Sequence, residues 1–150
     1  MIRATPFRPL VLTLCALMAL GLAACAEGPT GPSSGAPYSQ VDLRLGTGAD
    51  AVSGKNVVVN YTGWLYDPAK PDGKGLQFDS SDGSTPLTFT LGTGQVIEGF
   101  DRGITGMKVG GARRVVIPPS LGYGAARNNS IPQYATLVFE MELVEIVEPQ

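Results

Sequence analysis

The stretch Ala135-Thr136-Leu137-Val138-Phe139-Glu140-Met141-Glu142-Leu143 carries the strongest fold signal in this chain. Its large alternating apolar side chains are Leu137, Phe139, Met141 and Leu143. Glu140 and Glu142 fall between them. Because successive side chains of a β-strand point to opposite faces, this pattern predicts a strand with one buried face.

The same alternation occurs in three earlier stretches of the sequence. Their inward positions are Val57, Val59 and Tyr61, then Leu87, Phe89 and Leu91, and then Val115 and Ile117. Residues 67–75, between the first two of these strands, are rich in Gly, Pro and Asp and predict a loop. Together these segments predict an antiparallel sheet.

One stretch has the spacing of a helix instead of a strand. Its apolar residues are Val96, Ile97, Phe100 and Ile104. Gly99 and Gly103 lie inside it and weaken it as an autonomous helix, so packing on the sheet must hold it. The predicted fold class is therefore α+β, with four to six antiparallel strands and one short helix.

Composition excludes several classes of function. The formal net charge is -2, and the densest cation cluster is Arg113-Arg114, so no basic patch for nucleic acid is expected. The sequence has 0 His, which excludes Ser-His and Cys-His nucleophile pairs and histidine metal sites.

The first 25 residues have the pattern of a signal peptide. Arg3 and Arg8 precede an uncharged apolar run, residues 10–24, that is short for a membrane span. The run ends in Leu22-Ala23-Ala24-Cys25, which resembles a bacterial lipobox in which the cysteine is lipidated. The alternative is an ordinary secretory peptide cut nearby, with Cys25 incidental.

Lipidation would place the protein in the cell envelope, on the periplasmic side. Ala26 after the cysteine favours the outer membrane by resemblance, and without lipidation the protein would be secreted.

Residues 26–37 are rich in Gly, Pro and Ser and predict a flexible tether, and residues 38–150 form the predicted domain. Both cysteines, Cys15 and Cys25, precede that domain, which therefore has no disulfide or thiolate metal site.

Generic catalytic motifs do not identify an activity. Gly92-Thr93-Gly94 lacks the third glycine of a dinucleotide-binding loop, and Asp79 with Asp82 lacks the spacing of a calcium loop. No cofactor and no metal is expected. Composition and spacing alone indicate only a small β-rich domain.

Seven short blocks, in order along the chain, are more informative. They are Val59-Asn60-Tyr61-Thr62-Gly63, Phe78-Asp79-Ser80-Ser81, Gly94-Gln95-Val96-Ile97-Glu98-Gly99-Phe100, Met107-Lys108-Val109-Gly110, Pro119-Ser120-Leu121-Gly122-Tyr123-Gly124, Ile131-Pro132 and Ala135-Thr136-Leu137-Val138-Phe139. The ordered set resembles the signature blocks of FKBP-type peptidyl-prolyl cis-trans isomerases, and it covers residues 38–147.

This resemblance implies a twisted antiparallel sheet curled around one short helix, with an apolar pocket between them. The implied pocket walls are Tyr61, Phe78, Phe89, Val96, Ile97, Tyr123, Ile131 and Phe139, and Phe100 is the implied floor. By resemblance, the backbone N–H of Ile97 and the hydroxyl of Tyr123 would each hold a substrate carbonyl, and Asp79 would orient the reacting amide. From periodicity alone, most of these aromatic residues would be read as ordinary core side chains.

The sequence also departs from the family pattern. Phe100 stands where well-known members have a tryptophan, Leu87 stands where an aromatic residue is common, and no arginine follows the Phe78–Ser81 block to pair with Asp79.

The implied function is isomerisation of Xaa-Pro bonds in envelope or secreted polypeptides, with macrolides as further ligands. The alternative is a module that binds proline-containing segments or a macrolide with little catalysis. A holdase chaperone is disfavoured, because no insert supplies an exposed apolar surface.

Overall fold

The computed structural model describes residues 35–128 and 130–147 of the chain. Its strands are β1 (Ser39–Arg44), β2 (Asn56–Tyr66), β3 (Lys74–Ser80), β4 (Leu87–Thr90), β5 (Ala112–Ile117) and β6 (Leu137–Val147). Its helices are α1 (Glu98–Ile104) and the short 3-10 turns η1 (Pro71–Gly73) and η2 (Pro119–Leu121).

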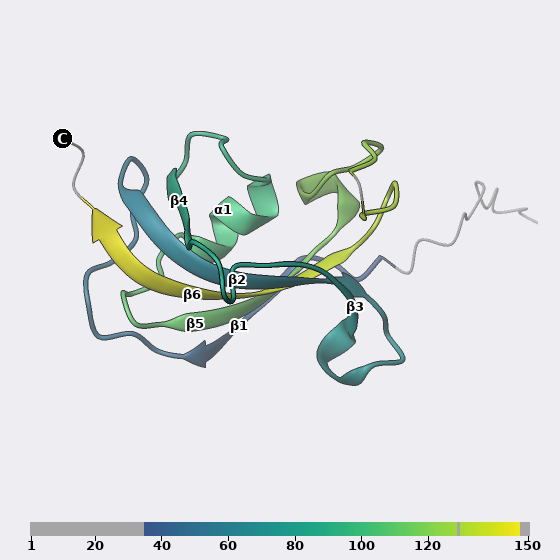
Figure 1. The fold of residues 1–150 in the computed structure, drawn as a ribbon, viewed down its shortest axis with the longest axis horizontal. Coiled ribbons are helices and arrows are strands. Elements are labelled where there is room, and N and C mark those ends of the chain that lie inside the picture. Colours follow the sequence, from purple (N-terminus) through teal and green to yellow (C-terminus); the bar gives the residue numbers. More distant parts are fainter. Residues whose placement is uncertain (1–34, 129, 148–150) are drawn as a thin grey trace, which may run out of the picture. The chain divides into compact units, whose positions relative to one another are not determined.

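The strands form one antiparallel sheet in the order β1-β5-β6-β2-β3, and β4 pairs with the first part of β2. The longest pairing, β2 with β6, runs from Asn56 opposite Val147 to Leu65 opposite Leu137. The sheet is strongly curved and α1 lies over its concave face (Figure 1). Six strands and one helix confirm the predicted fold class.

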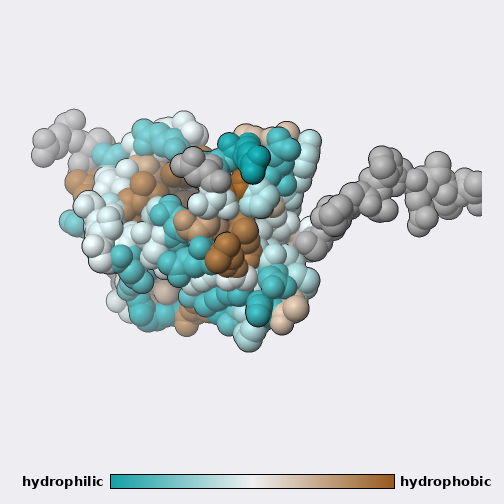
Figure 2. Space-filling view, turned by 45° about the vertical axis from the view of Figure 1, so that its right-hand side comes forward, coloured by the Kyte–Doolittle hydropathy of each residue, from teal (hydrophilic) through white to brown (hydrophobic). Residues whose placement is uncertain are grey.

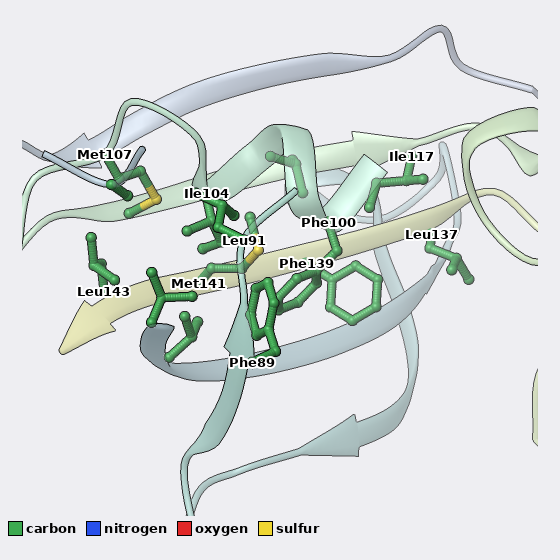
Figure 3. Close-up of a cluster of buried hydrophobic side chains, with 14 of the residues drawn as sticks. Phe89, Leu91, Phe100, Ile104, Met107, Ile117, Leu137, Phe139, Met141 and Leu143 are labelled. Carbon is green, nitrogen blue, oxygen red and sulfur yellow. The ribbon is translucent and has the colours of Figure 1, made fainter. Parts of the chain in front are cut away.

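The core lies between α1 and this concave face. The alternating residues of β6, namely Leu137, Phe139, Met141 and Leu143, are all at most 4% exposed and point inward (Figure 3). Val57, Val59, Val115 and Ile117 face the same core, and each is 0% exposed. Glu140 and Glu142 lie on the opposite, convex face, as the alternation of β6 predicted.

Two glycines allow α1 to lie close to the sheet. A Cβ on Gly99 would lie 2.4 Å from Cγ2 of Ile117, and one on Gly103 would lie 2.5 Å from Cε of Met141. The helix is therefore held by close packing, as predicted. It begins at Glu98, because Ile97 is extended and serves as the N-cap, so the prediction that Val96 belongs to the helix is wrong.

Two strands were not predicted from the sequence. In β1, the apolar Val41 and Leu43 alternate with polar residues, although every residue of this edge strand is exposed. Two register shifts interrupt β3, which pairs with β2 at the other edge. The predicted loop 67–75 ends at Gly73, because β3 begins at Lys74.

Cys25, the signal segment and residues 26–34 of the tether lie outside the described residues. Of the helices described, none is long and apolar enough to cross a membrane.

Candidate active site

A cavity of about 390 Å³ opens between the start of α1 and the concave face of the sheet. It is lined by Tyr61, Phe78, Asp79, Leu87, Gly94, Gln95, Val96, Ile97, Phe100, Tyr123 and Phe139. The structure thus brings together every residue predicted for the site except Phe89 and Ile131.

Phe100 forms the base of this cavity. Its ring is 3% exposed and packs edge-to-face on Phe139 at 5.2 Å and on Tyr61 at 5.7 Å between centroids. Such edge-to-face contacts suit the quadrupoles of aromatic rings. The ring of Phe89 lies 5.9 Å from that of Phe100 between centroids (Figure 3). Phe89 does not line the cavity, so it supports the base as a core residue.

A β-bulge turns two consecutive residues of β3 toward the cavity. Gly63 pairs with Asp79 and Trp64 pairs with Gln77, which leaves Phe78 as the extra residue. Gly63 makes room for this arrangement, because a Cβ there would lie 2.7 Å from Cζ of Phe78 and 2.8 Å from Cε1 of Phe139. The Phe78 and Phe139 rings therefore meet edge-to-face at 5.5 Å.

Asp79 is exposed at the edge of the cavity and is held by two neutral donors. Oδ2 accepts a hydrogen bond from the Tyr61 hydroxyl at 2.7 Å, and Oδ1 accepts one from the Ser80 N–H at 2.9 Å. No lysine or arginine in the described part of the chain forms an ion pair with it. Burial, the hydrogen bond to Asp79 and the charge of Asp79 raise the pKa of Tyr61 to about 12, so its hydroxyl remains a donor near neutral pH.

Ser81 fixes the backbone of Tyr61, and sequence reasoning gave this serine no role. Tyr61 lies where β2 changes its partner from β4 to β3, so no strand neighbour pairs with it on that side. Its N–H donates to Oγ of Ser81 at 2.9 Å, and its carbonyl accepts from the Ser81 N–H at 2.9 Å. Ser81 closes the Phe78–Ser81 block of the sequence, which was the available signal for it.

Leu87, Gly94 and Gln95 also line the cavity, although they were not predicted as site residues. The side-chain oxygen of Gln95 accepts a hydrogen bond from the N–H of Thr90 at 3.0 Å. This contact braces the turn that forms one wall of the cavity. Gly94 and Gln95 begin the third sequence block, whereas Leu87 was predicted as an inward strand position and noted as a departure from the family pattern.

Two hydrogen-bond donors at the cavity have no protein acceptor among the described residues. They are the backbone N–H of Ile97 and the hydroxyl of Tyr123. A bound peptide could satisfy both with its carbonyl oxygens. The cavity is thus suited to hold an extended peptide by few polar contacts and a broad apolar surface.

A second cavity of about 260 Å³ adjoins the first and shares Phe78, Asp79 and Tyr123 with it. Its other lining residues are Asn128, Ser130 and Ile131. Ile131, predicted for the main pocket, therefore lines this neighbour instead. Within the described ranges, no group of three or more His, Cys, Asp or Glu residues is placed to hold a metal ion.

The family model for FKBP-type peptidyl-prolyl cis-trans isomerase matches residues 48–144. The chain belongs to this family. As a member, it is a peptidyl-prolyl cis-trans isomerase.

Curated relatives and solved structures support the assignment to the FKBP-type family. The chain is 50% identical to an FK506-binding protein of Neisseria meningitidis over 109 residues, which are 71% of this chain and 94% of the relative. It is 43% identical to FK506-binding protein 1 of Aspergillus oryzae, covering 69% of this chain and 93% of the relative.

Two crystal structures share the fold. AtFKBP13 matches with a TM-score of 0.63 and 34% identity, covering 73% of this chain and 93% of that one. FkpA from Escherichia coli matches with a TM-score of 0.61 and 38% identity, covering 74% of this chain and 48% of that one.

Proposed function

We propose that this isomerase acts on Xaa-Pro bonds of envelope or secreted polypeptides and assists their folding. We also propose that the bond rotates in the cavity above Phe100. The observation that carries this proposal is an aromatic pocket with two unpaired donors, the Ile97 N–H and the Tyr123 hydroxyl.

The chemistry of the reaction fits such a pocket. Rotation of an Xaa-Pro amide has a barrier of roughly 18–20 kcal/mol, because resonance keeps the bond planar. The twisted transition state loses that resonance and is less dipolar than the planar amide. A dry aromatic pocket therefore stabilises the transition state relative to the ground state, without a covalent intermediate.

In this proposal each polar group has a separate role. The Ile97 N–H and the Tyr123 hydroxyl each hold a substrate carbonyl. Asp79, which accepts a hydrogen bond from the Tyr61 hydroxyl, orients the reacting amide. The walls formed by Phe78, Phe139 and their neighbours supply most of the stabilisation.

The direct test is cis/trans exchange measured by NMR on short peptides incubated with the full-length chain. Peptides with an apolar residue before proline should exchange fastest, because the cavity wall beside Phe78 and Tyr123 is apolar. If a chain shown to be folded by thermal unfolding leaves several Xaa-Pro peptides at their uncatalysed rate, the module that binds without catalysis becomes the better account.

The relatives named FK506-binding proteins suggest macrolides as further ligands. Phe100 offers a macrolide less contact area than a tryptophan would, so we expect binding that is weaker than in members with tryptophan at this position. Phe100→Trp should tighten binding of FK506, measured by calorimetry. An unchanged or weaker affinity would show that Phe100 does not contact the ligand.

We also propose a lipid anchor at Cys25 that holds the domain on the periplasmic side of the envelope, with the outer membrane favoured. The support is the signal-like segment and its final Leu22-Ala23-Ala24-Cys25. Cys25→Ala should shift the expressed protein from the membrane to the soluble fraction. Mass spectrometry that finds an unmodified N-terminus downstream of Cys25 would reject the anchor.

On the face shown in Figure 2, apolar residues lie in small areas separated by polar ones. That face offers no broad apolar area of the kind that a holdase needs for unfolded clients.

A further inference from the structure

Asp79 lies on the wall shared by the two adjoining cavities, and its charge has no cationic partner within the described part of the chain. The ion pairs found among the described residues involve other carboxylates than Asp79. The contacts to Asp79 are the hydroxyl of Tyr61 and the N–H of Ser80, both neutral. Two carboxylate oxygens offer about four acceptor positions, so these bonds leave capacity for a further donor.

The second cavity has a mixed lining that suits a long basic side chain. Its lining includes the apolar Phe78 and Ile131 and the polar Asp79, Asn128 and Ser130. Lysine and arginine bury an apolar stem and keep a charged head in contact with polar groups or water. A volume of about 260 Å³, open to solvent, accepts such a side chain when a peptide occupies the main pocket.

We propose that Asp79 and the second cavity select substrates with a lysine or arginine next to the Xaa-Pro pair. The inference rests on the proposed function, because the substrate must already lie in the pocket above Phe100. The carboxylate then attracts the cationic side chain of the flanking residue, and Asn128 and Ser130 offer it further acceptors.

The like charge of Arg127 lies near this cavity. Arg127 lines a neighbouring cavity together with Ser130 and Ile131, and it forms no ion pair with Asp79. It weakens the attraction for a basic substrate residue without removing it. Because Asp79 is exposed, the preference itself is modest and sensitive to salt.

The test compares peptides that share one Xaa-Pro pair and differ at a flanking position, which carries lysine, glutamine or norleucine. The lysine is placed before the pair in one set and after it in another. NMR exchange with the full-length chain should give the lysine peptide of one set a kcat/KM about 1.5- to 5-fold above its glutamine partner at low ionic strength. The advantage should fade in about 0.5 M salt.

Asp79→Asn should abolish the lysine advantage while glutamine and norleucine peptides remain substrates at a reduced rate. Asp82→Asn is the matched control, because Asp82 lines neither the main cavity nor the second one. It should keep the lysine advantage. Arg127→Ala should increase the advantage.

Two failures of this experiment are distinguishable. If the norleucine peptide is not isomerised by a folded chain, the proposed function fails. If that peptide is isomerised but lysine gives no advantage in either set, or Asp79→Asn preserves the advantage, only the selectivity proposal is overturned.

Discussion

Asp79→Leu and Tyr123→Phe each remove one polar group and little packed area, because Asp79 is exposed and phenylalanine keeps the ring of Tyr123 that packs against the core. Asp79→Leu or Tyr123→Phe should therefore change the free energy of unfolding by less than about 0.5 kcal/mol, as for typical surface changes. Each should raise the barrier to isomerisation by about 1–3 kcal/mol, the value of one hydrogen bond. Thermal unfolding and NMR exchange measure the two effects.

Matched controls for these variants are available on exposed residues. Tyr134 is 64% exposed and lines neither cavity, so Tyr134→Phe should keep full activity. Asp82→Leu should do the same. A folded Asp79 or Tyr123 variant without any activity would contradict a mechanism in which apolar walls supply most of the stabilisation, and full activity in both would contradict the roles given to these side chains.

At the scale of elements, α1 depends on the absence of side chains at its contact with the sheet. Alanine is a better helix former than glycine by about 1 kcal/mol. Gly99→Ala should nevertheless destabilise the fold by about 1–3 kcal/mol, because its Cβ would lie 2.4 Å from Cγ2 of Ile117. Chemical denaturation measures the change.

A double-mutant cycle separates this clash from any effect on the helix itself. Ile117→Ala removes the clashing atom, so it should cost less in the Gly99→Ala background than in the wild type. Additive effects would show that the contact between α1 and β5 is not the cause.

An ion network on the convex face joins three strands and the turn η1. Glu140 pairs with Lys74 at 2.5 Å and Arg114 at 2.9 Å, and Arg114 also pairs with Asp72 at 2.6 Å. Burial alone would raise the pKa of Glu140, but hydrogen bonds and charges from Lys74 and Arg114 lower it overall. The network therefore stabilises the fold above the usual pKa of a glutamate, and this contribution is lost as pH falls through the lowered pKa.

Glu140→Gln should consequently lower the free energy of unfolding near neutral pH and make stability less dependent on pH in the acid range. Urea unfolding at several pH values measures both effects. Glu142→Gln is the control, since Glu142 and its partner Arg44 are about half exposed and should contribute little. An unchanged acid profile in Glu140→Gln would contradict the role of the network.

At the scale of the whole molecule, alternation predicted the strands that have one buried face. It found parts of β2, β4, β5 and β6, because their inward side chains are large and apolar. It missed β1, although Val41 and Leu43 alternate there with polar residues, and it missed β3, whose bulges break the period of two. Helical spacing located α1 but extended it to Val96. In the sequence, an apolar residue just before an N-cap cannot be told from an apolar residue of the first helical turn.

The site was predictable only through the family resemblance, since periodicity alone cannot separate a pocket wall from a core residue. Phe89 and Ile131 show the limit of assigning site residues from the family resemblance. Phe89 packs against Phe100 as a core residue, and Ile131 lines the adjoining cavity. Ser81 has no periodic signal at all. Its role depends on the place where β2 changes partners, which is a property of the assembled sheet.

The central claim is that this pocket isomerises Xaa-Pro bonds by apolar stabilisation, with no proton transfer and no nucleophile. The most direct test is kcat/KM for one Xaa-Pro peptide, measured by NMR exchange with the full-length chain from about pH 6 to pH 9 and repeated in deuterated water. We predict clear acceleration, a flat pH profile and a solvent isotope effect close to unity. A bell-shaped profile with a large isotope effect, or no acceleration by a folded chain, would contradict this account.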